Sequence, residues 1–396
     1  MKSTRLAIIS THPIQYYAPI FKALAASKAV RPRVFFTWSQ TASGAVSDPG
    51  FGRTVEWDIP LLDGYEFEFV PNVARRPHTD HFRGLRNPAL IPCIESWRPQ
   101  AVLVFGWNFV SHLRALRHFR GRVPVFFRGD STLLNNRPDL RTRARRMLLR
   151  WIYRHVDVAI AVGSNNTDYF RWCGVPDERI AFAPHAIDTV RFDDGDGLHE
   201  ARAAEQLRNL RIPGGERVLL FAGKFIPEKD PALLLRAFMQ AQAPGHLVLV
   251  GNGPLEAELR ELCSGRNNVH FLPFQNQQAM PSIYRLGSTY ILPSRSETWG
   301  LALNEAMASG RSVIASTRVG ACKDLVREGI TGWTFESGNI QQLAAVIREA
   351  LTCPEHVLQG MGKAARAESS RWSIEAAADG IARAVNGFVD EKLPAA

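Results

Sequence analysis

Short apolar runs alternate with longer amphipathic stretches along most of the chain. In the first half, compact runs of aliphatic and aromatic residues lie at 6–9, 34–36, 101–105, 123–127, 158–162 and 180–182. Each run is predicted to be a strand, and amphipathic segments fill most of the intervals. Strands that alternate with helices in this way are typical of βαβ units that build a parallel sheet.

The alternation pauses at a polar stretch, 193–215, which has Asp-Gly-Asp-Gly near its start and Pro-Gly-Gly near its end. These turn-forming residues predict an interdomain linker. Beyond it the pattern restarts, with predicted strands at 218–221, 247–250, 269–272, 289–292 and 312–315, and predicted helices at 230–240, 254–263, 279–286 and 302–309. The pattern therefore predicts an α/β fold with two consecutive doubly wound parallel sheets.

The domain boundaries follow from this pattern. We expect an N-terminal domain at 1–192 and a C-terminal domain at 216–370, both Rossmann-like, with a ligand cleft between them. The last segment, 371–396, is predicted to be a helix that could reach back to the first domain. The stretch 48–72, rich in Gly, Pro and aromatic residues, fits no βα unit and is predicted to be an inserted loop or hairpin that carries function.

Composition narrows the class of protein. The chain has 396 residues, of which 45% are hydrophobic and 22% charged, so it can build packed cores and is not a disordered chain. Its formal net charge is +10. Residues 1–195 hold 27 basic and 17 acidic side chains, whereas 196–396 hold 21 of each. The excess positive charge therefore belongs to the first half.

The spacing of the cysteines and the length of the apolar runs indicate the cellular compartment of the protein. The five cysteines lie far apart, which indicates neither a zinc site nor a disulfide framework and fits a reducing compartment. The apolar stretch 6–9 is too short for a signal-peptide core, and no run approaches the roughly 18 residues of a spanning helix. We expect a cytoplasmic protein, with peripheral contact at the inner face of the membrane as an alternative.

The segment 294–310 carries the strongest chemical signal, because it holds two carboxylates, Glu297 and Glu305, eight positions apart. Glu297 follows a predicted strand and Glu305 lies in the next predicted helix, so both could face one ligand. Ionised carboxylates accept hydrogen bonds from the hydroxyl pairs of a sugar or ribose. Gly300 opens the helix without a side chain, which would let a phosphate approach its amides. Taken alone, both glutamates could equally be solvated residues at helix ends.

Four pieces of the second half together resemble the donor-binding signature of the retaining GT-B glycosyltransferases of family 4, the bacterial group 1 type. In order, they are 221–229 (FAGKFIPEK), 250–254 (VGNGP), the segment 294–310 with Pro293 before it, and 329–332 (GITG). The resemblance is specific over about 218–347 and looser before that. It implies a GT-B fold, in which two Rossmann-like domains face a central cleft.

The resemblance implies a role for each matching residue. Glu297 would bind hydroxyls of the donor sugar, and Glu305 would bind the nucleotide ribose. Lys224 and Lys229 would neutralise the pyrophosphate of the leaving nucleotide, which preorganised cations can do without a metal. The family usually has Arg at the position of Lys224, and a lysine supplies the charge without the bidentate fork. The alternative for Lys229 is a surface lysine in a first helical turn.

Turns beside these residues complete the predicted donor site. Gly251 and Gly253 could let the backbone approach the nucleotide, although an ordinary strand-to-helix turn explains them as well. Phe274 lies where the family contacts the base, with loop packing as the alternative. The predicted donor-binding residues are Gly223, Lys224, Lys229, Gly251, Asn252, Gly253, Phe274, Glu297, Thr298, Trp299, Gly300, Leu301 and Glu305. We expect no cofactor and no metal, only a UDP- or GDP-sugar as substrate.

The acceptor is expected at the first domain, where polar residues follow three predicted strands. Many family members have a Gly-rich turn after the first strand, and this chain has His12 in that place. The predicted catalytic residues of this domain are His12, Arg128 and Asp130, and the predicted acceptor-binding residues are Gln15, Tyr16, Trp107 and Asn108. The alternatives are a helix-start histidine at position 12 and an Arg–Asp pair that only fixes a turn.

A second departure from the family lies at 184–188, where the family commonly has Asn-Gly followed by an aspartate and this chain has His185 and Ala186. This difference could alter how the hinge meets the donor.

These inferences predict a retaining glycosyltransferase that moves a sugar from a nucleotide sugar to a saccharide or lipid-linked acceptor, in glycan or polysaccharide biosynthesis. The family offers no consistent nucleophile for double displacement, so front-face attack assisted by the leaving phosphate is the hypothesis. The alternatives are a GT-B nucleotide-sugar epimerase and a non-catalytic binder of anionic glycan. No nucleic-acid module is present, so nucleic acid is not expected as a partner.

The segment 137–154 holds seven arginines around several large apolar residues. One interpretation is a helix that lies on an anionic membrane surface. The other is a helix whose apolar side covers the first sheet while its arginines are solvated.

Overall fold

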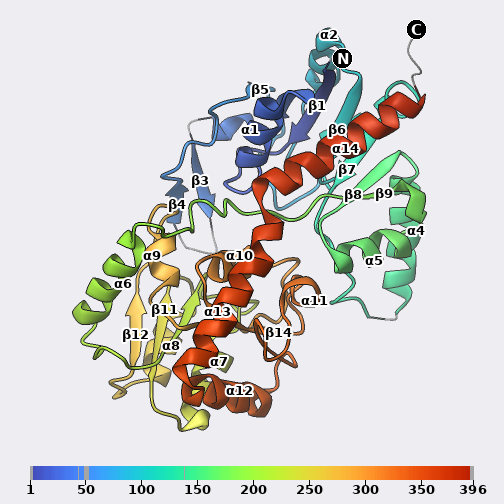
Figure 1. Ribbon diagram of the computed structural model, residues 1–396. Helices are drawn as coiled ribbons and strands as arrows, with labels where there is room; N and C mark the ends of the chain where they lie inside the picture. The colour runs from blue at the N-terminus through green and yellow to red at the C-terminus, as the bar shows by residue number, and fades with distance from the viewer. Residues whose placement is uncertain (1–2, 43, 49–52, 138, 393–396) are drawn as a thin grey trace. The chain divides into compact units, whose positions relative to one another are not determined.

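The computed structural model describes residues 3–42, 44–48, 53–137 and 139–392. The chain divides into two units. Unit 1 comprises Met1–Val46, Ile59–Ala186 and Ile374–Ala396, and unit 2 comprises Ser47–Asp58 and Ile187–Ser373 (Figure 1). Each unit contains one parallel sheet with helices, which confirms the predicted α/β class with two parallel-sheet domains.

Unit 1 is built on a sheet of seven parallel strands in the order β5-β2-β1-β6-β7-β8-β9. The strands are β1 (Thr4–Ser10), β2 (Val30–Phe36), β5 (Glu66–Phe69), β6 (Ala101–Phe105), β7 (Val125–Arg128), β8 (Val158–Ala161) and β9 (Ile180–Phe182). The α-helices are α1 (Ala18–Ser27), α2 (Leu90–Trp97), α3 (Val110–Phe119), α4 (Leu140–Tyr153), α5 (Ser164–Trp172) and α14 (Ile374–Lys392).

Helices cover both faces of this sheet because alternate residues of each strand point to opposite sides. Leu6 and Ile8 of β1 are buried in a cluster that includes residues of α1 and α14. Ala7 and Ile9 are buried in a second cluster, to which α2, α3, α4 and α5 contribute. The run of apolar residues in β1 is therefore explained by burial on two faces.

Unit 2 has a sheet of six parallel strands in the order β12-β11-β10-β13-β14-β15. They are β10 (Val218–Ala222), β11 (His246–Val250), β12 (Val269–Leu272), β13 (Thr289–Leu292), β14 (Ser312–Ser316) and β15 (Gly332–Phe335). The helices are α6 (Leu198–Asn209), α7 (Pro231–Ala241), α8 (Glu256–Leu262), α9 (Met280–Tyr284), α10 (Leu301–Ala308), α11 (Cys322–Leu325), α12 (Ile340–Thr352) and α13 (Glu355–Ser369). One face of the sheet is covered by α7 and α12, whose apolar side chains share a buried cluster with β10 and β11.

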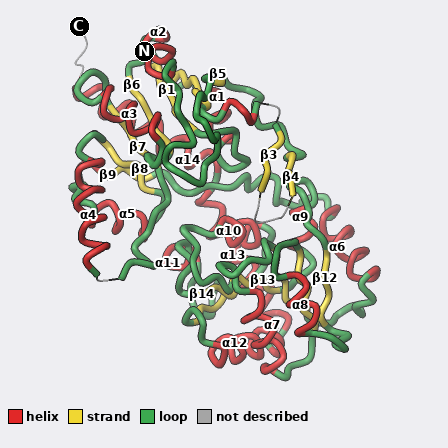
Figure 2. Tube along the Cα trace, turned by 180° about the vertical axis from the view of Figure 1, so that it is seen from behind, coloured by secondary structure: helices red, strands yellow, loops and turns green. Residues whose placement is uncertain are grey.

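The apolar pattern of the sequence did not predict the edge strands β5 and β15, nor the strands at the start of the segment 48–72. β5 lies within 48–72, and β15 begins at Gly332, the last residue of the polar turn 329–332. β4 (Arg53–Glu56) also lies in this stretch, and it pairs with β3 (Ala45–Asp48), which ends at the first residue of the stretch, in a two-stranded sheet visible in Figure 2. Residues 49–52 of the predicted loop lie outside the described residues. The sequence assigns all of 48–72 to the first domain, whereas Ser47–Asp58 groups with unit 2.

Hydrogen bonds explain that grouping. Gln278 donates its backbone N–H to the Asp58 carboxylate at 3.1 Å, and the Asn276 side chain donates to the Glu56 carbonyl at 2.8 Å. These contacts join distant parts of the sequence, which is why a local pattern does not predict them.

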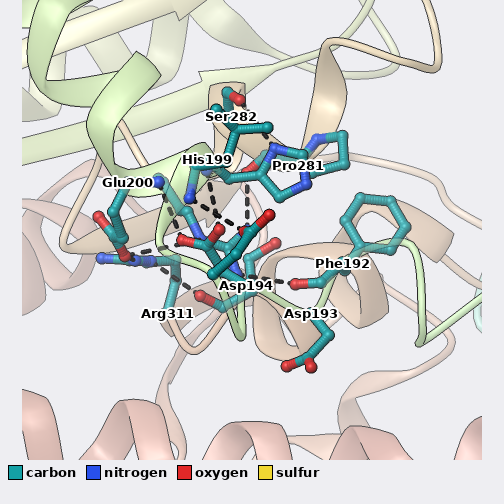
Figure 3. Close-up of polar contacts among 12 residues, drawn as sticks. Phe192, Asp193, Asp194, His199, Glu200, Pro281, Ser282 and Arg311 are labelled. Carbon is teal, nitrogen blue, oxygen red and sulfur yellow. Dashed lines mark hydrogen bonds and ion pairs between the residues drawn. The ribbon is translucent and has the colours of Figure 1, made fainter.

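The predicted linker at 193–215 is an ordered part of unit 2. Asp194 accepts hydrogen bonds from the backbone of His199 (2.8 Å) and Glu200 (2.9 Å), which are in the first turn of α6 (Figure 3). The buried Arg285 lies 3.3 Å from Asp194 and donates to the Phe192 carbonyl at 2.8 Å. Its side chain is only 2% exposed. The Asp-Gly-Asp-Gly sequence thus forms the start of a packed helix rather than a free connection.

The last helix, α14, belongs to unit 1 although it follows unit 2 in sequence. Its residues Ile381 and Val385 are buried in the cluster that also holds Ile20 and Leu24 of α1. Figure 1 shows this helix in red, against the blue elements at the start of the chain. Among the described residues, no helix is both long and apolar enough to cross a membrane.

Candidate functional site

The central feature of unit 2 is an ion pair between two of the predicted donor residues. Lys229 lies in the loop between β10 and α7, and Glu297 lies in the loop between β13 and α10. β10 and β13 are neighbours in the parallel sheet, so both loops leave the same edge. The Lys229 ammonium donates to the Glu297 carboxylate. Their side chains are 22% and 19% exposed, so both remain within reach of a ligand.

Two further contacts fasten these loops together. Arg295 donates its guanidinium Nε to Asp230 at 2.6 Å, and its backbone N–H donates to the Glu228 carbonyl at 2.8 Å. Asp230 is buried at the start of α7, with a φ of 49°, and accepts from the Leu233 backbone. The capping aspartate therefore fixes Lys229 next to it, and the arginine fixes the loop of Glu297.

Glu305, predicted to bind the ribose, is enclosed inside unit 2. It is 2% exposed and accepts a 2.6 Å hydrogen bond from the Tyr284 hydroxyl, and Arg191 lies 3.8 Å from its second oxygen. Tyr290 of β13 is buried, and burial together with the charges of Glu297 and Glu305 raises its pKa well above the usual value. The structure thus gathers Glu297 and Glu305 around the end of β13.

The glycine turn after β11 packs against the loop that carries Lys224. The φ values of Gly251 and Gly253 are 143° and 159°, and a Cβ on Gly251 would overlap the Gly223 carbonyl. Asn252 accepts from the Phe274 backbone at 2.8 Å and donates to Glu256 at 2.9 Å. These glycines are explained by backbone packing, while Asn252 connects the predicted base-contact loop to the rest of the site.

Gly300 caps the N-terminus of α10, and its backbone conformation and surroundings favour glycine. Its φ is 99°, and a Cβ would lie 2.9 Å from Val319 and 3.0 Å from Leu292. Thr298 and Leu301 flank this helix start, and Thr298 is exposed while Leu301 is half-buried. The indole of Trp299, predicted to bind donor, is 2% exposed, donates to Asn304 at 2.9 Å and packs on Trp372. Its side chain therefore stabilises the helix start from inside unit 2.

In unit 1, the predicted acceptor residues follow the carboxyl ends of adjacent strands. His12, Gln15 and Tyr16 follow β1, Trp107 and Asn108 follow β6, and Asp130 follows β7. β1, β6 and β7 are consecutive in the sheet, so these residues occupy one edge of it. Asn108 is exposed, whereas Trp107 is partly buried against the core cluster that contains α4 and α5.

Arg128 differs from its neighbours because it is buried. It is 2% exposed and donates 2.7 Å hydrogen bonds to the carbonyls of Ala183 and Pro184. Burial lowers its pKa to about 10, which still leaves it charged at neutral pH. The sequence predicts a catalytic role, but this geometry supports the alternative in which the arginine fixes a turn.

Three histidines of this edge are uncharged at neutral pH. Burial lowers the pKa of His12 and of His112 to about 4, and that of His185 to about 3. His112 hydrogen-bonds to Thr37 (2.9 Å) and the Gly106 carbonyl (2.8 Å), so it holds the turn before Trp107. His185 lies 4.0 Å from Asp130 and stacks on Tyr17.

Several residues that shape these sites were missed by sequence reasoning. Tyr284, Tyr290 and His112 lie inside helices or strands, where a polar residue in an apolar segment looks like ordinary packing. Arg191 and Arg295 had no distinguishing local pattern. Tyr284 contacts Glu305, 21 positions away in sequence, Arg191 contacts the same glutamate, and Arg295 contacts Asp230, 65 positions away, so only the fold reveals these contacts.

Comparison with known proteins agrees with this arrangement of the sheets. The model for "Glycosyltransferase Family 4" matches residues 51–191, and the model for "Glycosyl transferases group 1" matches residues 203–368. The chain belongs to the group 1, family 4 type of glycosyltransferases. The GT-B fold is supported by HepE from Anabaena, solved with UDP, which matches with a TM-score of 0.72 at 17% identity over 97% of this chain and 100% of HepE.

Relatives of known name match a part of this chain. A D-inositol 3-phosphate glycosyltransferase from Segniliparus rotundus is 32% identical over 52% of this chain and 46% of its own length. The sulfoquinovosyl transferase SQD2 from Arabidopsis thaliana is 29% identical over 58% of this chain and 44% of its own length. The alignments span about half the length of these relatives, so they inform the family and not the substrates.

Proposed function

We propose that the protein transfers a glycosyl group from a nucleotide sugar, bound by unit 2, to a saccharide or lipid-linked acceptor, bound by unit 1. The observation that carries this proposal is the Lys229–Glu297 pair at the shared edge of β10 and β13. It supplies a cation for a diphosphate and a carboxylate for sugar hydroxyls, side by side and partly exposed.

The pair also indicates how binding would proceed. A donor diphosphate would compete with Glu297 for the Lys229 ammonium, and Glu297 would then be available to accept from hydroxyls of the sugar. Lys224 lies in the same loop as Lys229 and would add a second cation. As the glycosyl bond breaks, negative charge grows on the leaving diphosphate, and cations already in position stabilise that charge without reorganisation.

The remaining parts of the proposal follow the family. We propose retention of anomeric configuration through front-face attack, with the acceptor at the edge that carries Asp130, Gln15, Tyr16 and Asn108. UDP- and GDP-sugars are the donor classes to test. A role in glycan or polysaccharide biosynthesis, in the cytoplasm, fits this chemistry.

Paired substitutions test the donor site. Glu297→Gln and Lys229→Met should each lower sugar transfer about 10²- to 10³-fold, as the loss of one preorganised electrostatic group does. The matched controls Glu258→Gln and Lys363→Met change exposed residues of unit 2 and should leave the rate unchanged. The measurement is release of nucleotide from UDP- and GDP-sugars, with and without a panel of saccharide acceptors.

The outcomes separate the candidate functions. Transfer that needs an acceptor and is lost in both site variants supports the proposal. Altered sugar formed without acceptor would favour an epimerase, and indifference to every nucleotide sugar would favour a binder. Near wild-type transfer by Lys229→Met would contradict the assigned site.

A further inference from the structure

The connection from β5 to α2 in unit 1 contains a long loop, residues 71–88, that is folded on itself. Asn72 is buried, and its side-chain oxygen accepts from the Arg86 backbone N–H at 2.9 Å, so it joins the two ends of the loop. Its amide donates to the Gly84 carbonyl at 3.0 Å. A Cβ on Gly84 would overlap the His78 carbonyl, so the middle of the loop also packs closely. The loop is therefore held in a defined shape.

A small buried cluster fixes this loop to the edge of the sheet where the parallel strands end. Leu85 of the loop is buried with Trp38, which follows β2, and with Phe109, which follows β6. The rings of His12 and His78 both contact Trp38 edge-on, with centroids 5.3 and 5.4 Å from that of the indole. Open α/β sheets bind ligands at this edge, and the predicted acceptor residues lie there too.

A second buried asparagine fastens the end of the loop. Asn87 donates its side-chain N–H groups to the carbonyls of Thr37 (2.8 Å) and Val70 (2.9 Å), which directly follow β2 and β5. Groups that are ordered before a ligand arrives lose less conformational entropy when they bind it. The loop thus forms a preorganised surface at the carboxyl ends of the strands.

This surface is strongly basic. Exposed arginines occupy both halves of the loop, at Arg75, Arg76, Arg83 and Arg86. Among the residues whose side chains the structure describes, no carboxylate lies within ion-pair distance of these four guanidinium groups. The loop contains one acidic residue, Asp80, whose carboxylate lies 3.0 Å from the His78 imidazole. Elsewhere in unit 1, exposed arginines do have carboxylate partners, as Arg31 has in Glu66 at 2.8 Å. We call residues 71–88 the arginine loop.

We propose that the arginine loop binds an acidic group of the acceptor, which is then a saccharide with a carboxylate or a phosphate. The proposal rests on the proposed sugar transfer, because it names the class of acceptor. A guanidinium group can donate two parallel hydrogen bonds to either acidic group, and such charge-assisted bonds are stronger than neutral ones. Neutral hydroxyls of the same acceptor would be left to Gln15, Tyr16 and Asn108.

Matched pairs of acceptors test the charge. Methyl glucuronide and methyl glucoside differ by a carboxylate at C6, and glucose 6-phosphate and glucose differ by one phosphate. The measurement is KM and kcat for each acceptor, with the nucleotide sugar that the wild-type protein uses. The KM of the acidic member of at least one pair should be lower about tenfold or more, as one charge-assisted hydrogen bond provides. The pair that shows the difference distinguishes a carboxylate from a phosphate.

Two double variants test the loop itself. Arg75→Gln/Arg76→Gln and Arg83→Gln/Arg86→Gln should each raise the KM for the preferred acidic acceptor about tenfold more than the KM for its neutral partner. A purely structural role of these arginines would affect both acceptors equally. The variants should keep the wild-type melting temperature, because all four positions are exposed. The matched control Arg202→Gln/Arg208→Gln removes two exposed arginines from α6 of unit 2 and should leave the preference for acid unchanged.

The outcomes separate this inference from the proposed function. Transfer to acidic and neutral acceptors with equal KM, or an unchanged preference in both loop variants, would overturn the inference and leave sugar transfer standing. If no nucleotide sugar is used with any acceptor, sugar transfer itself fails. Saturation-transfer NMR without donor then tests the loop directly. Binding of methyl glucuronide or glucose 6-phosphate that is lost in the loop variants would support the acidic site, and no binding by the wild-type chain would overturn it.

Discussion

Arg128 and Asp130 are two residues apart, yet their surroundings differ sharply. Arg128 is enclosed and holds the two carbonyls that follow β9, while 38% of the Asp130 side chain is exposed at the same edge. Residue type and spacing predicted the same role for both. Burial separates them, because only an accessible group can touch an acceptor.

This difference leads to opposite expectations for their variants. Arg128→Met would leave the Ala183 and Pro184 carbonyls without their donor, and should lower the free energy of unfolding by about 2–5 kcal/mol. Asp130→Asn should change it by less than about 1 kcal/mol but reduce sugar transfer. Urea titration and the transfer assay measure the two effects. A stable Arg128→Met variant would contradict the structural role.

The buried histidines of unit 1 predict how its stability depends on pH. His12, His112 and His185 have folded-state pKa values lowered to about 4, 4 and 3, against 6.5 when unfolded. Below pH 6.5 the unfolded chain binds more protons than the folded one, so the stability present at higher pH is lost as pH falls. Each histidine should contribute a slope approaching about 1.4 kcal/mol per pH unit between pH 6 and 5.

Denaturant titrations between pH 7 and 5 measure that slope for unit 1. His112→Gln should reduce the slope by about one proton. Equal stability of the wild-type chain at pH 7 and pH 5 would contradict the buried, neutral state of these histidines.

At the scale of elements, the apolar pattern predicts most of the sheets because buried parallel strands are continuous apolar runs. Leu6–Ile9 and Ala101–Phe105 are examples whose residues are buried on both faces. The pattern fails at β5 and at β3 and β4, where strands lie at an edge or outside the main sheets. For α4 it left open a membrane-surface helix and a helix that covers the sheet, and the structure buries Leu149, Ile152 and Tyr153 in the core cluster on one side of the sheet.

In the predicted donor loops, too, the sequence predicts some features and leaves others to the packing of the helices. Lys229, Glu297 and Gly300 could be predicted because each lies at a strand end in a recognisable segment. The Asp230–Arg295 bond and the enclosure of Glu305 by Tyr284 could not, since they depend on how α7, α9 and α10 pack. Sequence indicates which residues can do chemistry, and packing decides which are accessible.

Two glycines of α14 give a prediction at this scale. A Cβ on Gly380 would lie 2.7 Å from the Phe182 carbonyl, whereas nothing lies within 4 Å of one on Gly387. Gly380→Ala should lower the free energy of unfolding by about 1–3 kcal/mol through overpacking. Gly387→Ala should raise it by about 0.5–1 kcal/mol through helix propensity. Urea titration measures both, and equal effects of the two variants would contradict the packing of α14 on β9.

At the scale of the whole molecule, the chain order and the spatial units differ. Ser47–Asp58 belongs to unit 2 and Ile374–Ala396 to unit 1, so each unit is completed by a segment from the other half of the sequence. Part of the excess positive charge of the first half is concentrated on α4, whose arginines form no ion pair with a described carboxylate. Unit 2 uses single placed cations such as Lys229 instead.

The reaction itself is the most direct test of the account. Proton NMR can follow the anomeric signal of the sugar while the wild-type protein is incubated with the nucleotide sugar that it binds and a saccharide acceptor. Retaining transfer at the Lys229–Glu297 site predicts a product with the same anomeric configuration as the donor, formed together with free nucleoside diphosphate and absent with Glu297→Gln. A product of inverted configuration, or one formed equally by Glu297→Gln, would contradict it.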